Sequence, residues 1–197
     1  MPPPSMAAGL LLKRALDFAA EQHKDQLRKY PNASVPYVSH VAGVVAVLAR
    51  HGFDEEIQAA GALHDVMEDC NVPFDELERR FGERVASLVR DCSEEDKSLS
   101  WEERKAAYVA KFPNKPLDAQ AVTVADKIDN FLSIEVAAHD HGDPWTMFKR
   151  GRTEQLERFD ALAAATGALA QAHAGLVDEF RLVLARVRAL PHDGGAP

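Results

Sequence analysis

Apolar residues recur at helical spacing along almost the whole 197-residue chain, and this pattern constrains the fold more than any other feature. In residues 10–27, for example, Leu12, Ala15, Leu16 and Ala19 fall three or four positions apart, the spacing that gathers side chains on one face of a helix. No strand-type alternation, with its period of two, lasts for more than a few residues. The sequence therefore predicts an all-α bundle of roughly eight helices.

Capping and loop residues predict where these helices begin and end. Asp54 is the expected N-cap of the third helix, and Ser100 with Glu103 has the pattern of a capping box. Gly52 is the expected stop of the second helix. The expected helices cover residues 10–27, 37–52 and 54–69, two short stretches around Gly82, residues 100–111 and 117–139, and two further stretches within 145–190.

Length and patterning predict one domain over residues 10–190, with frayed tails at 1–9 and 191–197. The net charge of −8 argues against a binder of nucleic acid or anionic membranes, which is usually basic. The two cysteines suit a reducing compartment, and the sequence has neither a signal-peptide pattern nor an apolar stretch that could span a bilayer. We therefore expect a cytoplasmic protein without a nucleic-acid or membrane partner; whether it forms homo-oligomers stays open.

One segment, GALHDVMEDC at residues 61–70, places four ionisable side chains among residues that favour burial. If the helix continues through it, His64 lies above Glu68 and Asp65 above Asp69, because residues four apart share a face. A solvated acidic edge with one satisfied histidine would explain this pattern in isolation. The preceding small apolar residues predict close packing, however, and uncompensated carboxylates are costly there. A bound cation is the simplest compensation.

Two ionisable residues on other predicted helices complete a candidate ligand set. His40 shares a helical face with Val44 and Val47, where a histidine is more often a core residue than a ligand. Asp126 lies at the edge of the apolar face of the long helix, four residues before Asn130, and could equally belong to a buried ion pair. The combination of a histidine, a His-Asp step and an aspartate, each at the core-facing edge of its helix, favours a metal site. Such ligands suit Mn²⁺, Fe²⁺ or Zn²⁺.

The order H…HD…D resembles the signature of the HD superfamily of metal-dependent phosphohydrolases, and further segments strengthen the resemblance. ALHDVMED at 62–69 is similar to the HDxxED element of the RelA/SpoT hydrolase domains, and VADKIDN at 124–130 is similar to their ADKxxN element. RKYPNASVPYVSH at 28–40 resembles the family segment in which basic residues precede Pro-Tyr-x-x-His. FDELERRFGERVASLV at 74–89 stands at the expected place. The similarity extends over about 10–188, and the nearest group is the stand-alone small alarmone hydrolases.

The resemblance implies an HD-domain helical bundle and assigns roles by position. Four residues would hold the metal ion: His40, His64, Asp65 and Asp126. Two acids would orient or deprotonate the attacking water: Glu68 and Asp69. Three residues would contact the nucleotide substrate: Arg28, Lys29 and Asn130.

By the same resemblance, the reaction would be Mn²⁺-dependent hydrolysis of the 3′-diphosphate of guanosine tetra- and pentaphosphate, with release of pyrophosphate and without a synthetase domain. Another divalent transition metal could replace Mn²⁺. One alternative is an HD phosphohydrolase for another nucleotide, such as an adenine alarmone, a nucleoside monophosphate or a phosphorylated dinucleotide. A second alternative is a catalytically idle nucleotide-binding module.

Three departures from the family pattern fall in substrate-facing regions, and none affects the metal set. Tyr30 stands where a cation is common, the region at 93–108 is longer, and Leu156 replaces an expected aromatic residue. The basic residues Arg150 and Arg152, with Lys149, are either phosphate contacts or a solvated basic face. Fewer sequence matches therefore support guanine nucleotides as the substrate than support the metal site.

Overall fold

The computed structural model describes residues 9–93 and 100–191. Within these ranges the chain is helical, and its only pairing of the β type is an isolated bridge between Leu27 and Pro36. The all-α prediction is therefore confirmed. The predicted tails lie outside the described residues apart from residues 9 and 191, as do residues 94–99 of the region at 93–108.

The described part contains eleven α-helices, some of them one or two turns long, and three short helical elements of other types. The α-helices are α1 Leu10–Gln22, α2 Val38–Arg50, α3 Glu55–Leu63, α4 Val66–Asp69, α5 Phe74–Phe81, α6 Glu83–Cys92, α7 Trp101–Lys111, α8 Leu117–Val136, α9 Arg152–Ala164, α10 Gly167–Ala172 and α11 Ala174–Ala189. The short elements are η1 Phe112–Asn114, the π-turn η2 Ala137–His141 and η3 Pro144–Met147. No helix of the described part is long and apolar enough to cross a membrane.

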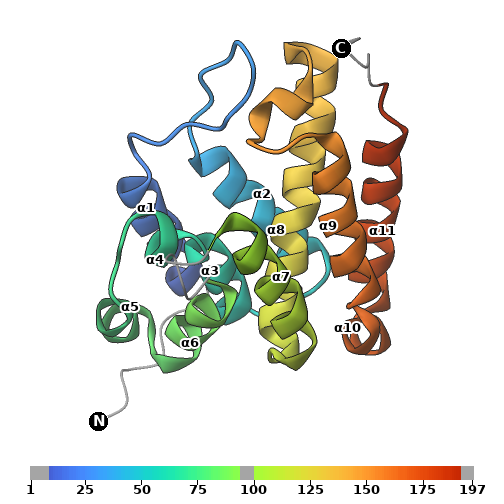
Figure 1. Cartoon of the computed structure of the whole chain (residues 1–197). Helices are drawn as coiled ribbons and strands as arrows, with labels where there is room; N and C mark the ends of the chain where they lie inside the picture. The colour runs from blue at the N-terminus through green and yellow to red at the C-terminus, as the bar shows by residue number, and fades with distance from the viewer. Residues whose placement is uncertain (1–8, 94–99, 192–197) are drawn as a thin grey trace.

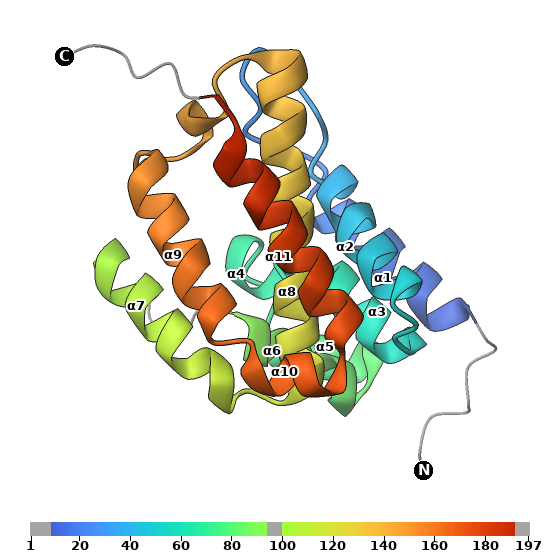
Figure 2. The same ribbon diagram turned by 90° about the vertical axis from the view of Figure 1, so that its right-hand side faces the viewer.

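Helix α8 forms the centre of the bundle (Figure 1). Every residue from 119 to 126 is buried, because α2, α3, α6 and α11 all pack against this helix. Helices α1 to α6 lie on one side of α8 in Figure 1, and Figure 2 shows α11 crossing its other side beside α9 and α7. Helices α2 and α3 approach closely at Gly61, where an added Cβ would lie 2.4 Å from a methyl carbon of Leu48.

The predicted caps are confirmed. Asp54 accepts a hydrogen bond from the amide of Ile57 at 2.9 Å and starts α3. At the start of α7, the Ser100 hydroxyl accepts from the Glu103 amide at 3.2 Å, and the Glu103 carboxylate accepts from the Ser100 amide at 3.0 Å. Such caps satisfy amide groups that the first turn of a helix leaves without partners.

The expected end of the first helix was wrong: α1 stops at Gln22 and does not continue to residue 27. Beyond it, two stretches of backbone bond to each other. The Arg28 amide donates to the Val35 carbonyl at 2.8 Å, and the Tyr37 amide donates to the Gln26 carbonyl at 2.9 Å. These bonds close a loop over residues 26–37 that ends next to α2.

The expected single helix over residues 54–69 was also wrong, because it divides into α3 and α4 at His64 and Asp65. The His64 ring nitrogen Nδ1 donates to the Gly61 carbonyl oxygen at 2.8 Å. In a continuous helix that oxygen would accept the amide of Asp65. The ring thus takes the acceptor of a helical hydrogen bond, and the regular helix ends here although the backbone of both residues stays in the right-handed helical region. The last third of the chain likewise forms three helices, α9 to α11, where two were expected.

Candidate metal centre and substrate pockets

Four predicted ligands converge from three parts of the bundle. His40 comes from α2, His64 and Asp65 from the junction of α3 and α4, and Asp126 from α8. The Nε2 atom of His40 lies 3.3 Å from Nε2 of His64 and 3.3 Å from Oδ1 of Asp126. The Nε2 atom of His64 lies 2.9 Å from Oδ2 of Asp65 and 3.8 Å from Oδ1 of Asp126. Side chains that are up to 86 positions apart in sequence thus meet at one buried point.

These distances fit a shared divalent ion. Ligand atoms that are each about 2.1 Å from one ion lie roughly 3–3.5 Å from each other. The donor atoms of His40, His64 and Asp65 all lie within 4.8 Å of one another, and Asp126 Oδ1 lies within 4 Å of both imidazoles. Two imidazoles and two carboxylates form a donor set for a divalent transition ion.

Both imidazoles are oriented with Nε2 toward the cluster. The Gly61 carbonyl can only accept, so Nδ1 of His64 carries a proton. Nδ1 of His40 lies 2.6 Å from a carboxylate oxygen of Asp129 and donates to it. Ligating histidines usually have such a partner on the second ring nitrogen, because it fixes the tautomer that leaves the first nitrogen able to bind.

The charges of the cluster perturb one another strongly. Burial opposes a charged His64, but the neighbouring Asp65 outweighs burial and raises the pKa of His64 to about 9. Burial would raise the pKa of Asp65, yet the same His64 lowers that pKa below its usual range. The pKa of Asp126 is also lowered against the effect of burial, first by Lys127, whose Nζ lies 2.5 Å from Oδ2 of Asp126. The two acids therefore favour positive charge at the centre of the cluster.

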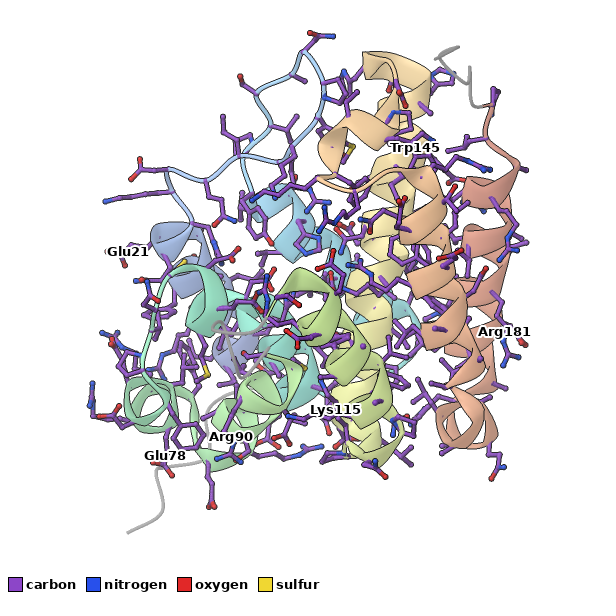
Figure 3. The ribbon with its side chains drawn as sticks, viewed as in Figure 1. Glu21, Glu78, Arg90, Lys115, Trp145 and Arg181 are labelled. Atoms are coloured by element: carbon purple, nitrogen blue, oxygen red, sulfur yellow. The ribbon has the colours of Figure 1, made fainter. Side chains whose placement is uncertain are left out.

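The four candidate ligands lie in a hollow that we call the metal pocket. Glu68 lines it, so one of the two predicted catalytic acids faces the cluster. The Tyr37 hydroxyl donates to Asp65, and the Asn130 amide donates to Asp126 at 2.5 Å. The pocket is also lined by residues of α7, α8 and α9, among them Tyr108, Val109, Lys127, Arg158, Phe159 and Leu162. Figure 3 shows side chains filling the space between α2, α7 and α8, whereas the labelled Glu21 lies at the periphery.

A second hollow, the outer pocket, adjoins the first. It is lined by Gln26, Leu27, Arg28, Lys29, Tyr37, Asp69, Asn130, Met147 and Phe148. Tyr37 and Asn130 line both pockets and form the boundary between them. Asp69 is exposed and accepts a hydrogen bond from the Gln26 side chain at 2.7 Å. The two predicted acids, Glu68 and Asp69, thus face different pockets.

The three predicted nucleotide contacts all line the outer pocket. Arg28 is held against α8, because its NH2 group donates to Asn130 Oδ1 at 3.0 Å and to Ser133 Oγ at 2.9 Å. Its guanidinium also lies over the Tyr37 ring, 5.7 Å from the ring centroid. Lys29 is exposed. The structure therefore brings one hydrogen-bonded arginine and one exposed lysine to the same pocket.

Neither Leu156 nor Tyr30, which depart from the family pattern, lines the two pockets, and the same holds for Arg150. Leu156 of α9 packs in the hydrophobic core of the bundle, and Phe159 from the same helix supplies an aromatic ring to the metal pocket. Tyr30 stacks on His141 with ring centroids 5.1 Å apart. Arg150 pairs with Glu102, and neither residue lines the two pockets.

Sequence reasoning missed Asp129, which occupies an unspecified position of the ADKxxN element. It lies three residues after Asp126, and Gly43 lies three residues after His40. These two spacings could have indicated the contact, because residues three apart lie on the same side of a helix. Asp129 therefore shares a side of α8 with Asp126, and Gly43 shares a side of α2 with His40. Only the packing of α2 against α8 shows that the two sides face each other.

Known proteins share both the sequence pattern and the fold. A family model described as an HD domain matches residues 15–147. The guanosine-3′,5′-bis(diphosphate) 3′-pyrophosphohydrolase MESH1 of Xenopus tropicalis is 38% identical over 133 residues, which are 66% of this chain and 73% of that protein. The human protein of the same name is 39% identical over 132 residues, which are 66% of this chain and 72% of that protein. A solved structure described as "A metazoan ortholog of SpoT hydrolyzes ppGpp and plays a role in starvation responses" is similar with a TM-score of 0.79 at 28% identity, covering 95% of this chain and 100% of that one.

Proposed function

Because the chain belongs to the HD domain family, we propose that it is a metal-dependent pyrophosphohydrolase that removes the 3′-diphosphate of guanosine tetra- and pentaphosphate. Relatives at 38–39% identity carry that activity in their names. The observation that carries the proposal is the meeting of His40, His64, Asp65 and Asp126 at one buried point, with a further acid, Glu68, in the same pocket.

In this proposal four side chains hold the ion: His40, His64, Asp65 and Asp126. When bound, the ion supplies Lewis-acid activation of water and of the phosphoryl group. We assign Mn²⁺ as the ion in the cell, because mixed imidazole and carboxylate ligands suit it, and other divalent transition ions fit the same donor set.

Glu68 acts as the general base of the proposed reaction. It takes a proton from the attacking water, whose oxygen forms a bond to the phosphorus attached to the ribose 3′-oxygen. The bond between that phosphorus and the 3′-oxygen breaks, the 3′-oxygen gains a proton, and pyrophosphate is released. Lys127 and Arg158 line the same pocket and stabilise the negative charge that develops on the phosphoryl oxygens.

The outer pocket holds the remainder of the nucleotide. Arg28, Lys29 and Asn130 line it, and the side chain of Phe148 offers an aromatic face for a base. Asp69 lies at this pocket and accepts from Gln26, so we assign it to orienting the substrate, with Glu68 as the base. Tyr37, at the boundary, orients Asp65 through its hydroxyl group.

A panel of purine nucleotides tests the proposal. Nucleotides with 3′-diphosphates, 3′-phosphates or 5′-phosphates are incubated with the protein and Mn²⁺, and the products are separated. We expect pyrophosphate and GDP from guanosine tetraphosphate, and no product when Asp65→Ala replaces the wild type. Release of orthophosphate from a 5′-monophosphate, or turnover of an adenine 3′-diphosphate alone, would favour a different HD phosphohydrolase. Nucleotide binding without turnover would indicate an idle binding module.

A further inference from the structure

Asp129 lies directly behind His40, on the side away from the proposed metal ion. Its Oδ2 atom is 2.6 Å from Nδ1 of His40, while Nε2 of His40 faces the ligand cluster. The His40 side chain is 1% exposed and the Asp129 side chain 14% exposed, so little solvent competes for this hydrogen bond. Without Asp129, the buried Nδ1–H group would lose its partner, which is costly in a protein interior.

Arg28 also lies near Asp129, but it is not the main partner of the Asp129 carboxylate. The closest approach of Arg28 to it is 4.0 Å, at the limit of an ion pair. The same guanidinium nitrogen makes shorter hydrogen bonds to Asn130 and Ser133. The imidazole of His40 is therefore the principal partner of the Asp129 carboxylate.

A glycine makes room for this carboxylate. Gly43 follows His40 by nearly one turn of α2, and a Cβ built there would lie 1.8 Å from Oδ1 and 2.6 Å from Cγ of Asp129. Both distances are far below van der Waals contact, so any larger residue would displace the carboxylate. The absence of a side chain at position 43 thus allows Asp129 to reach His40.

We propose that Asp129 is a positioning residue of the metal centre, which holds His40 in the tautomer and orientation that bind the ion, and that Gly43 provides the space for it. The inference rests on the proposed function only in taking His40 as a metal ligand. Such a partner on the far ring nitrogen is a common feature of ligating histidines, and its loss usually weakens metal binding. Asp129 touches neither the ion nor the substrate in this arrangement.

Metal affinity of the purified protein tests the proposal without any substrate. Mn²⁺ dissociation constants are measured by competition with a chelator for the wild type, Asp129→Asn, Asp129→Ala and Gly43→Ala. Asp129→Ala is expected to weaken Mn²⁺ binding by about 10- to 100-fold, the usual cost of losing such a partner. Asp129→Asn keeps an acceptor for Nδ1–H but removes the charge, so we expect a partial loss. Asp118→Asn, on the same helix but in an ion pair with Arg84, serves as the matched control.

A double-mutant cycle separates positioning from a general packing effect. Gly43→Ala should weaken metal binding although it alters no ligand, because the new methyl group displaces Asp129. In the Asp129→Ala background the methyl group finds space, so Gly43→Ala should add little further loss. Visible absorption of the Co²⁺-substituted proteins should show an altered ligand field in both single variants. Thermal unfolding of the metal-free proteins identifies any variant that does not fold, in which case Asp129→Asn carries the test.

Wild-type Mn²⁺ affinity and an unchanged Co²⁺ spectrum in Asp129→Ala would overturn the inference, as would fully additive losses in the cycle. A wild-type protein that binds Mn²⁺ but does not hydrolyse guanosine tetraphosphate would overturn the proposed function alone. In that case the affinity losses expected above would still support the role of Asp129. A wild type that binds neither Mn²⁺ nor Co²⁺ would overturn both.

Discussion

The metal pocket and the outer pocket share Tyr37 and Asn130 but are built in opposite ways. The candidate ligands of the metal pocket come from helices that form the centre of the bundle, and three of the four are at least 90% buried. The outer pocket is lined mainly by the loop at 26–37 and by residues around η3. A packed core holds its side chains closely, whereas connecting segments tolerate change. Under the proposed function, we therefore expect the packed core to set the chemistry and the segments around it to set the choice of substrate.

The largest effect that would test this division is expected from Asp65→Ala. The variant loses a carboxylate that lies 2.9 Å from His64 and anchors the cluster. We expect loss of bound Mn²⁺ together with a fall in kcat of at least about 10³-fold, because the ion supplies several kcal/mol of transition-state stabilisation. Metal content and kinetics measured on the same preparation check this. Asp75→Ala, an exposed residue of α5, is the control. A metal-loaded Asp65→Ala protein would contradict the ligand assignment.

Replacement of Glu68 by Ala should separate chemistry from metal binding. Glu68 lines the metal pocket without belonging to the ligand set, so the variant should retain Mn²⁺ while kcat falls by about 10²-fold or more, the range for a general base. Asp69→Ala, at the outer pocket, should change KM more than kcat. Steady-state kinetics of both variants test whether the two successive acids divide as their pockets do. Equal losses in kcat would show that they act as one unit.

The accuracy of the sequence predictions also differs between the packed helices and the segments that connect them. Helical periodicity placed His40 and Asp126 beside apolar faces, and burial of both is confirmed at 2% and 8% exposure. The interruption at His64 was not predicted, because it depends on a ring-to-carbonyl hydrogen bond that periodicity does not encode. The start of the loop after α1 was placed too late, since its backbone bonds join residues seven and eleven positions apart, a pairing that helical periodicity does not reveal.

Asp129 and Gly43 show a further limit of prediction from one sequence. Their contact joins two helices whose residues are more than 80 positions apart, and nothing in either helical segment alone pairs the two residues. A close approach of this kind is a property of tertiary packing. It becomes visible only when the crossing of α2 over α8 is known.

Without bound metal, the free energy of unfolding of the protein should depend on pH through His64. His64 has a pKa of about 9 in the folded protein and 6.5 in an unfolded chain. The folded state therefore holds a proton that the unfolded state releases, and this stabilisation is complete below pH 6.5 and lost as pH rises to about 9. We expect the metal-free protein to lose at most about 3 kcal/mol over that interval. Thermal unfolding in EDTA from pH 6 to pH 9.5 measures the change.

The variant His64→Gln is the control for this titration, because it keeps a polar side chain without the ionisable ring. Its stability should vary less with pH than that of the wild type over the same interval. Equal pH dependence in the two proteins would show that another group is responsible.

The smallest expected effect concerns Arg28, which borders both regions. Its guanidinium lies at the outer pocket, but it is fixed to α8 by Asn130 and Ser133. If it contacts phosphate or base, Arg28→Ala should raise KM by about tenfold, the value of one hydrogen bond to a charged group, with kcat little changed. Arg150→Ala, a cation outside both pockets, should leave KM unchanged. A fall in kcat and in Mn²⁺ affinity at constant KM would instead place Arg28 with Asp129 among the supports of the metal centre, and the boundary between the two regions would then lie outside Arg28.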